Sequence, residues 1–201
     1  LWTRDEPTAS HPSVRWSTVA AWTGHEYRSA MTWSEISKPG SGTSPSPWEG
    51  EPEGGHLSPP LREALAEILG EFTSTPERCW FAVWTGYADV YDRMTEETPT
   101  LRIPKREFIL YRAPLHAMPT FEFGQFRHSF SMAWPDDRSW FVGSESDLCS
   151  TYVGASAPCI IRILTDGRLE ALPMLPNTPV SDPQSHDNPS GGGGFVASSE
   201  A

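Results

Sequence analysis

Two carboxylates and a histidine are the side chains of this sequence whose types and spacing could support catalysis. Glu145 and Asp147 are two residues apart, and on a strand such residues point to the same face. Two carboxylates on one face could hold a divalent cation, or one could act as a base whose pKa the other raises. With His128, and with His116 as a further ligand, they would form a metal-dependent hydrolase. The alternative is a solvated strand end.

No local motif supports that enzyme. The sequence has no G-x-S-x-G, no Gly-rich phosphate loop before a helix and no H-E-x-x-H. The three cysteines, Cys79, Cys149 and Cys159, include no C-x-x-C pair, which predicts free thiols in a reducing compartment. Cys159 lies in an apolar stretch, where a buried and inert thiol is the usual state. We therefore expect no cofactor and favour a non-enzymatic protein.

Tryptophans and acids offer a second hypothesis, a surface that binds another protein. Trp134 directly precedes Pro135 and is the tryptophan that we expect to be exposed. Trp80, Trp84 and Trp140 lie in short apolar runs, so we expect them in the core. The predicted binding residues are Trp134, Asp136, Asp137, Glu145 and Asp147.

The net charge of the chain indicates which class of macromolecule it could bind. The chain has 15 Lys and Arg against 26 Asp and Glu, a net charge of −11. Its largest basic cluster in the central region is the pair Lys105 and Arg106, which argues against nucleic acid because phosphates require a basic face. A basic protein partner suits the acidic balance better. The sequence gives no indication of an oligomeric state.

Localisation follows from the absence of two signals in the sequence. No apolar run approaches the roughly 18 residues of a membrane helix, and no basic region followed by an apolar one resembles a signal peptide. We therefore expect a cytoplasmic protein with no membrane partner. The sequence opens with Leu1 and not Met, so a preceding segment could be missing.

Hydrophobic periodicity predicts a mixed fold. Pro59 suits the first helical position after Ser58, and apolar residues then recur with helical spacing as far as Phe72. Such a helix needs a sheet or another helix against it. We predict an α+β fold, with an antiparallel or mixed sheet of about five strands packed on one face by two or three helices. The expected strands are 79–84, 107–111, 121–132, 139–145 with 150–153 as its partner, and 169–174; a second helix is expected at 157–164.

Composition divides the chain into five parts. Pro, Gly and Ser are concentrated in two stretches that cannot bury enough apolar surface to fold. In the N-terminal region, Thr32 and Glu35 match a capping box, which predicts a short helix. The predicted parts are a disordered 1–13, a helical segment 14–37 that packs on the main domain, a linker 38–56, one α+β domain 57–176 and a disordered tail 177–201.

A C-terminal pattern adds a resemblance. It comprises Trp134-Pro135-Asp136-Asp137-Arg138-Ser139-Trp140-Phe141-Val142, then Glu145-x-Asp147, then Ser150-Thr151-Tyr152-Val153-Gly154. This pattern resembles one in uncharacterised proteins of high-GC Gram-positive bacteria. The resemblance implies a bacterial cytosolic protein and brings no catalytic residues with it. Some such proteins are small acidic α+β modules of the same broad class as toxin-immunity proteins.

The sequence therefore supports two hypotheses about function. The first is a non-enzymatic acidic protein-binding module of a bacterial cytosol, of an immunity-like kind. The second is a small metal-dependent hydrolase that uses Glu145, Asp147 and His128.

Overall fold

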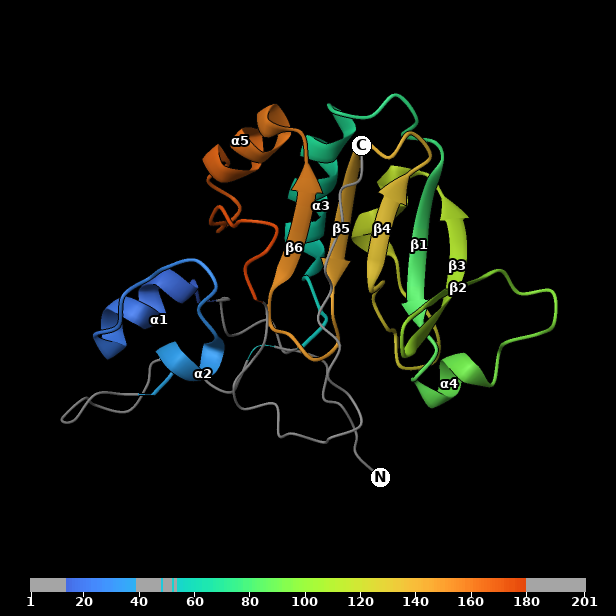
Figure 1. The fold of residues 1–201 in the computed structure, drawn as a ribbon, viewed down its shortest axis with the longest axis horizontal. Helices are drawn as coiled ribbons and strands as arrows, with labels where there is room; N and C mark the ends of the chain where they lie inside the picture. Colours follow the sequence, from blue (N-terminus) through green and yellow to red (C-terminus); the bar gives the residue numbers. More distant parts are fainter. Residues whose placement is uncertain (1–13, 39–47, 49–51, 53, 180–201) are drawn as a thin grey trace.

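A six-stranded antiparallel sheet organises the chain in the computed structural model, which describes residues 14–38, 48, 52 and 54–179 (Figure 1). The predicted α+β class is confirmed, and every strand pairing is antiparallel. The order across the sheet is β2-β3-β1-β4-β5-β6. The strands are β1 (Cys79–Trp84), β2 (Thr100–Ile103), β3 (Arg106–Ala113), β4 (Met132–Pro135), β5 (Trp140–Ser144) and β6 (Thr151–Ala155).

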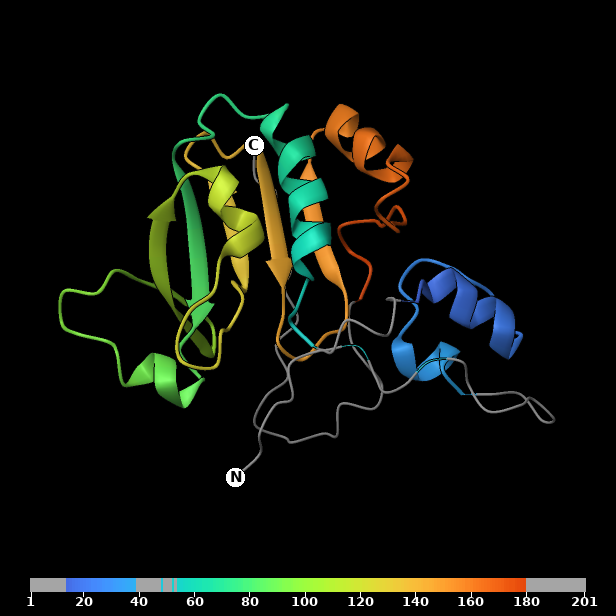
Figure 2. The same ribbon diagram turned by 180° about the vertical axis from the view of Figure 1, so that it is seen from behind.

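The helices gather on one face and at the ends of the sheet. Helix α3 and the 3-10 helix η1 lie behind the strands, and Figure 2 shows them from that side. Helix α5 packs on α3 and β6. The helices are α1 (Trp16–Thr23), α2 (Trp33–Ile36), α3 (Pro59–Gly70), α4 (Ala88–Tyr91), η1 (Leu115–Thr120) and α5 (Ala157–Thr165).

The main core lies between the sheet and these helices. Helix α3 begins at Pro59 as predicted and buries Leu65, Ile68 and Leu69 in this core. Each such side chain gains roughly 1.5–3 kcal/mol when it leaves water. From the sheet, Phe81 contributes a fully buried ring that stacks on Phe121 at 4.8 Å between ring centroids.

One charged side chain is buried in this layer. Arg62 of α3 is 1% exposed, and its Nη1 donates to the carbonyl oxygens of Met118 at 3.3 Å and Phe121 at 2.6 Å. Burial lowers the pKa of Arg62, and the nearby Glu122 opposes that shift. The guanidinium thus donates to two carbonyls where η1 ends, one of which, Met118, also accepts from the N–H of Phe121.

Three elements differ from the sequence expectation. The expected strand at 121–132 is wrong: residues 121–131 contain an isolated bridge between Phe123 and His128, because Gly124 and Arg127 have positive φ angles that turn the chain, and strand β4 begins only at Met132.

The polar stretch after α4, where no strand was expected, contains β2, whose Leu101 and Ile103 pair with β3. The expected last strand at 169–174 is not a strand. This segment instead turns toward the N-terminal region: Glu170 accepts hydrogen bonds from the backbone N–H groups of Trp16 and Ser17, at 2.7 and 2.9 Å. Its Glu170 side chain therefore binds the start of α1, while Leu169 and Ala171 pack against the main core.

The N-terminal segment has a small core of its own. Val19, Ala20, Trp33 and Ile36 are buried together, with Trp48 packed against them. The capping box is confirmed, because Thr32 Oγ1 accepts from the N–H of Glu35 and the Glu35 carboxylate accepts from the N–H of Thr32. The segment joins the rest of the chain through Glu170 and through Ser29, which donates to the Pro173 carbonyl at 2.7 Å.

Several predicted regions lie outside the described residues. The N-terminal stretch 1–13 is one of them, together with most of the linker 38–56 and the part of the tail beyond residue 179. The predictions of disorder for these stretches therefore stay predictions.

Candidate functional site

The face of the sheet opposite α3 carries a second group of apolar side chains. Successive residues of a strand point to opposite faces, so Trp80, Ala82 and Trp84 of β1 share this side while Phe81 and Val83 face the helices. Among the described elements, none covers these strands in the view of Figure 1. This side of the sheet, the tryptophan face, comprises Trp80, Ala82, Trp84, Leu101, Ile103, Phe108, Leu110, Met132, Trp134 and Phe141. Of these, Ala82, Phe108 and Met132 are buried beneath their neighbours.

The tryptophan face corrects one expectation about the core. Trp140 is 2% exposed, as expected of a core residue. Trp80 and Trp84 were expected beside it, but they lie on the opposite face and are only partly buried. The physical reason is that the described helices cover only one face of β1. Trp134, expected to be exposed, is partly buried and stacks on Phe141 at 6.2 Å between ring centroids.

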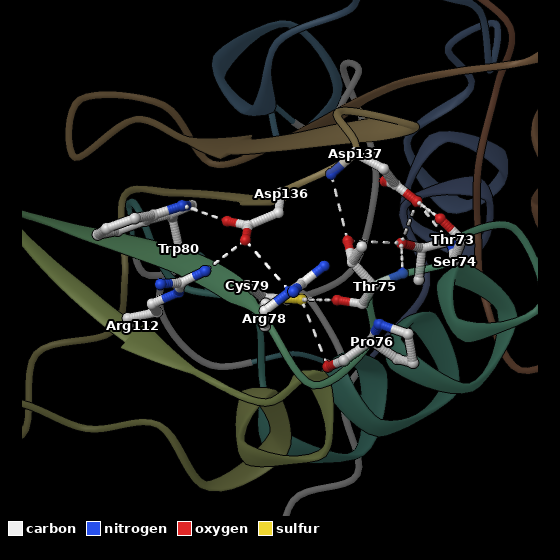
Figure 3. Close-up of polar contacts among 10 residues, drawn as sticks. All are labelled: Thr73, Ser74, Thr75, Pro76, Arg78, Cys79, Trp80, Arg112, Asp136 and Asp137. Carbon is white, nitrogen blue, oxygen red and sulfur yellow. Dashed lines mark hydrogen bonds and ion pairs between the residues drawn. The ribbon is translucent and has the colours of Figure 1, made fainter.

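At one end of this face a carboxylate gathers three donors (Figure 3). Asp136 accepts from Trp80 Nε1 at 2.8 Å, and its other oxygen pairs with Arg78 Nε at 3.3 Å and with Arg112. The Arg112 guanidinium also lies 5.3 Å from the Trp80 ring centroid, a cation–π contact. This cluster of two arginines around one carboxylate marks one end of the face, the Trp80 end.

At the other end an arginine gathers two carboxylates. Arg106 lies 4.6 Å from the ring centroid of Trp84. Its guanidinium pairs with Glu145 at 3.1 Å and with Asp147 at 2.7 Å. The two predicted carboxylates are thus brought together, but by a cation of the chain itself. This end, the Trp84 end, has an excess of negative charge.

Asp137 has a different role from its neighbour Asp136. One of its oxygens accepts from Ser74 N at 2.6 Å, from Ser74 Oγ at 2.8 Å and from Thr73 Oγ1 at 2.9 Å (Figure 3). Burial raises the pKa of Asp137, but hydrogen bonds from Ser139 and Ser74 outweigh it and hold the pKa well below its ordinary value. The carboxylate therefore anchors the turn after β4 to the loop after α3.

The hydrolase hypothesis required His128 beside Glu145 and Asp147. Instead His128 Nε2 lies 2.8 Å from Asp89, and its ring stacks on Tyr87 with centroids 3.8 Å apart. Asp89 also accepts from the backbone of the turn at Gln125, at 3.0 Å. Within the described part of the chain, no three His, Cys, Asp or Glu residues are placed to hold a metal ion.

The remaining reactive groups give no catalytic arrangement either. His116 is exposed on η1, and Cys159 is buried with a thiol pKa that burial raises. Cys79 is buried too, and burial raises its thiol pKa to about 11. A protonated, buried thiol is a poor nucleophile.

Sequence reasoning missed the arginines of this site. Arg106 and Arg112 belong to β3, where they share a face with Phe108 and Leu110. Their alternation along one predicted strand was the available signal, since residues i, i+2 and i+4 of a strand line one face. The partners are far away in the chain, 41 residues between Arg106 and Asp147, so no local pattern predicts the pairs.

Comparison with known proteins gives no relative: no family model, no curated protein and no solved structure matches this chain. Of the helices that the structure describes, none has the length and apolar character needed to cross a membrane.

Proposed function

We propose that this protein is a non-enzymatic protein-binding module and that the tryptophan face is its interface. The observation that carries the proposal is an aromatic sheet face that no described helix covers, with Phe141 at 43% exposure beside the partly buried Trp134. Exposed aromatic surface is typical of interaction sites.

The residue types of the face support this function. Tryptophan and arginine are among the residues most enriched at positions that dominate binding energy. Arg106 and Arg112 are already stacked on Trp84 and Trp80 and paired with carboxylates. Because these long side chains are ordered before any partner arrives, binding loses less side-chain entropy.

The charge of the chain favours a basic partner. A net charge of −11 attracts a positively charged protein over distances longer than a contact, which speeds the encounter. An immunity-like role in a bacterial cytosol, in which a small acidic protein blocks a basic toxin, is one form of this function. It rests on the C-terminal resemblance.

A photo-crosslinking experiment tests this function. A benzophenone amino acid is placed at Phe141 and, as a matched control, at Ile161, which is 60% exposed on α5 away from the tryptophan face. In cells that produce the protein we expect a discrete crosslinked basic protein from position 141 and none from position 161. Trp134→Ala should then weaken binding of that purified partner about 10-fold or more, as measured by calorimetry.

Equal crosslinking from both positions, or an unchanged affinity of Trp134→Ala, would overturn the assignment of this face.

A further inference from the structure

We propose that the tryptophan face binds its partner through an arginine side chain of that partner, whose guanidinium stacks on Phe141 above Gly154. The proposal rests on the proposed function, because it takes this face as the interface, and it adds the chemical group that the face recognises. Its grounds are the exposed ring of Phe141, the open space above Gly154 and the arginines that already cover two other rings of the face.

Phe141 ends a row of side chains that crosses the sheet from strand to strand. Arg112 of β3 is opposite Trp80 of β1, and Trp80 is opposite Trp134 of β4. Trp134 in turn stacks on Phe141 of β5, with ring centroids 6.2 Å apart. The next position in the row is Gly154 of β6, directly opposite Phe141. The row thus begins with a cation, continues with three rings and ends at a residue without a side chain.

The space above Gly154 is open among the residues that the structure describes. Apart from its chain neighbours, a Cβ placed on Gly154 would have no heavy atom within 4 Å. Side chains directly opposite each other in an antiparallel pair have Cβ atoms about 4.5–5.5 Å apart, so a group in this space lies beside the Phe141 ring. That ring is 43% exposed and reaches toward Gly143, where a Cβ would lie 3.2 Å from Phe141 Cε1. The side of the ring toward Gly154 is therefore free for a group of the partner.

Two other rings of the face show which group suits such a position. Arg106 lies 4.6 Å from the ring centroid of Trp84, and Arg112 lies 5.3 Å from that of Trp80. Both arginines belong to β3 and cover rings of the adjacent strand β1. A guanidinium is planar, stacks on aromatic faces and is more weakly hydrated than an ammonium group. Arginine is therefore the cation that we expect beside an exposed ring of this face.

The hairpin of β5 and β6 does not supply such a cation. From residue 139 to residue 161 the charged residues are Glu145 and Asp147, and both pair with Arg106. In the described part of the chain, no arginine or lysine lies over the tryptophan of β4 or the phenylalanine of β5. An arginine of the partner would fill this position, and the net charge of −11 attracts a partner that carries one.

Nuclear magnetic resonance of the full chain, titrated with hexaarginine at physiological salt, tests this site. We expect the signals of the Gly154 amide and of the Phe141 ring to shift and to saturate together. Hexalysine has the same charge but no planar group, so its shifts at these two positions should be about threefold smaller or less at equal concentration. Methyl glucoside is the uncharged probe, since sugars also stack on aromatic rings. Shifts at both positions from the sugar and none from hexaarginine would overturn the arginine site.

Filling the open space gives the sharper test. Gly154→Val should raise the urea midpoint of unfolding by about 0.3 M, because a β-branched residue suits a strand and packs beside the Phe141 ring. The same variant should reduce the hexaarginine shift of that ring about fivefold, a loss that a more stable protein cannot owe to unfolding. Gly167→Val is the matched control, at another glycine whose Cβ would have no neighbour within 4 Å, and should leave the shift unchanged. Phe141→Leu keeps an apolar side chain but removes the ring, so it should abolish the Gly154 shift.

Hexaarginine that leaves both signals unshifted up to about 5 mM, or shifts that persist in Gly154→Val and Phe141→Leu, overturn the arginine site. Equal shifts from hexalysine overturn it too, because charge alone would then account for binding. Any of these results leaves the proposed function standing if position 141 still crosslinks to a basic protein and position 161 does not. Equal crosslinking from both positions removes the interface, and the arginine site with it.

Discussion

The same strands supply side chains to both faces of the sheet, but the two faces differ in burial. Along β1, Phe81 and Val83 are 0% exposed beneath the helices, whereas Trp80 and Trp84 are only partly buried on the other side. The sequence supplies large apolar residues to both faces. The difference comes from what packs against them: α3 and η1 on one face, and arginines held by carboxylates on the other.

The comparison shows how a face can stay aromatic without a covering layer. On the covered face, apolar contacts stabilise the fold and can hardly change. On the tryptophan face, Arg106 and Arg112 lie across the rings of Trp84 and Trp80, and each guanidinium is paired with carboxylates of the chain. Substitutions on the two faces should therefore differ most in their effect on stability.

The largest difference is expected between two aromatic residues. Phe81→Ala should lower the free energy of unfolding by about 3–5 kcal/mol, because it leaves a cavity against Phe121 and Phe130. Trp134→Ala on the tryptophan face should cost less than half of this, since its ring is already partly solvated. Urea denaturation measures both. Equal losses would mean that the tryptophan face is as much a core as the other.

Two arginines extend the comparison to charged side chains. Arg62→Met should cost about 1–3 kcal/mol, because the Phe121 carbonyl loses its donor at 2.6 Å, whereas the Met118 carbonyl keeps the N–H of Phe121. Arg112→Met, at a side chain that is half exposed, should cost at most about 1 kcal/mol. The same urea series gives both values, and a costlier Arg112 variant would contradict the distinction between the faces.

Asp137 links stability to pH at the Trp80 end. Its pKa is depressed in the folded chain, so its contribution is fully present above the ordinary carboxyl pKa of about 4 and is lost as pH falls through the folded value. Asp137→Asn should cost at most about 1 kcal/mol at pH 7, because the group is exposed and screened. It should also flatten the loss of stability below about pH 4. Thermal melts across this acidic range and up to neutral pH check the change, and parallel curves would exclude it.

The smallest effects are expected between the two ends of the tryptophan face. Asp136→Asn removes a carboxylate with three donors whose side chain is 25% exposed, and should cost about 0.5–1 kcal/mol. Asp147→Asn acts on a side chain that is 66% exposed and should cost about 0–0.5 kcal/mol. A reversed order in urea denaturation would show that the Trp84 end is the more rigid one.

Local sequence signals predict those elements whose start and buried side are encoded in their own residues. Helix α3 has a proline at its start and an apolar stripe, and α2 has a capping box, so both could be located from the sequence. Strand β2 could not, because it is short and polar and exists through its pairing with β3. The prediction for 169–174 was wrong in the opposite way. This segment has the composition of a strand, but its Glu170 carboxylate accepts a hydrogen bond from the first residue of α1.

The site shows the same limit. The acidic pair of Glu145 and Asp147 was visible in the sequence, but Arg106, which binds both, lies in a different strand. The even spacing of Trp80 and Trp84 in one strand places them on the same face. It could not predict which face the helices cover, because that depends on contacts between distant parts of the chain.

The hydrogen bonds from Trp16 and Ser17 to Glu170 bring residues separated by more than 150 positions into contact. The first helix and the last segment of the described fold therefore lie side by side. Because its first and last elements are neighbours, such a fold can be inserted into a surface turn of another protein without separating the two sides of that turn. It also offers a natural point for circular permutation, with new termini opened in an exposed turn elsewhere.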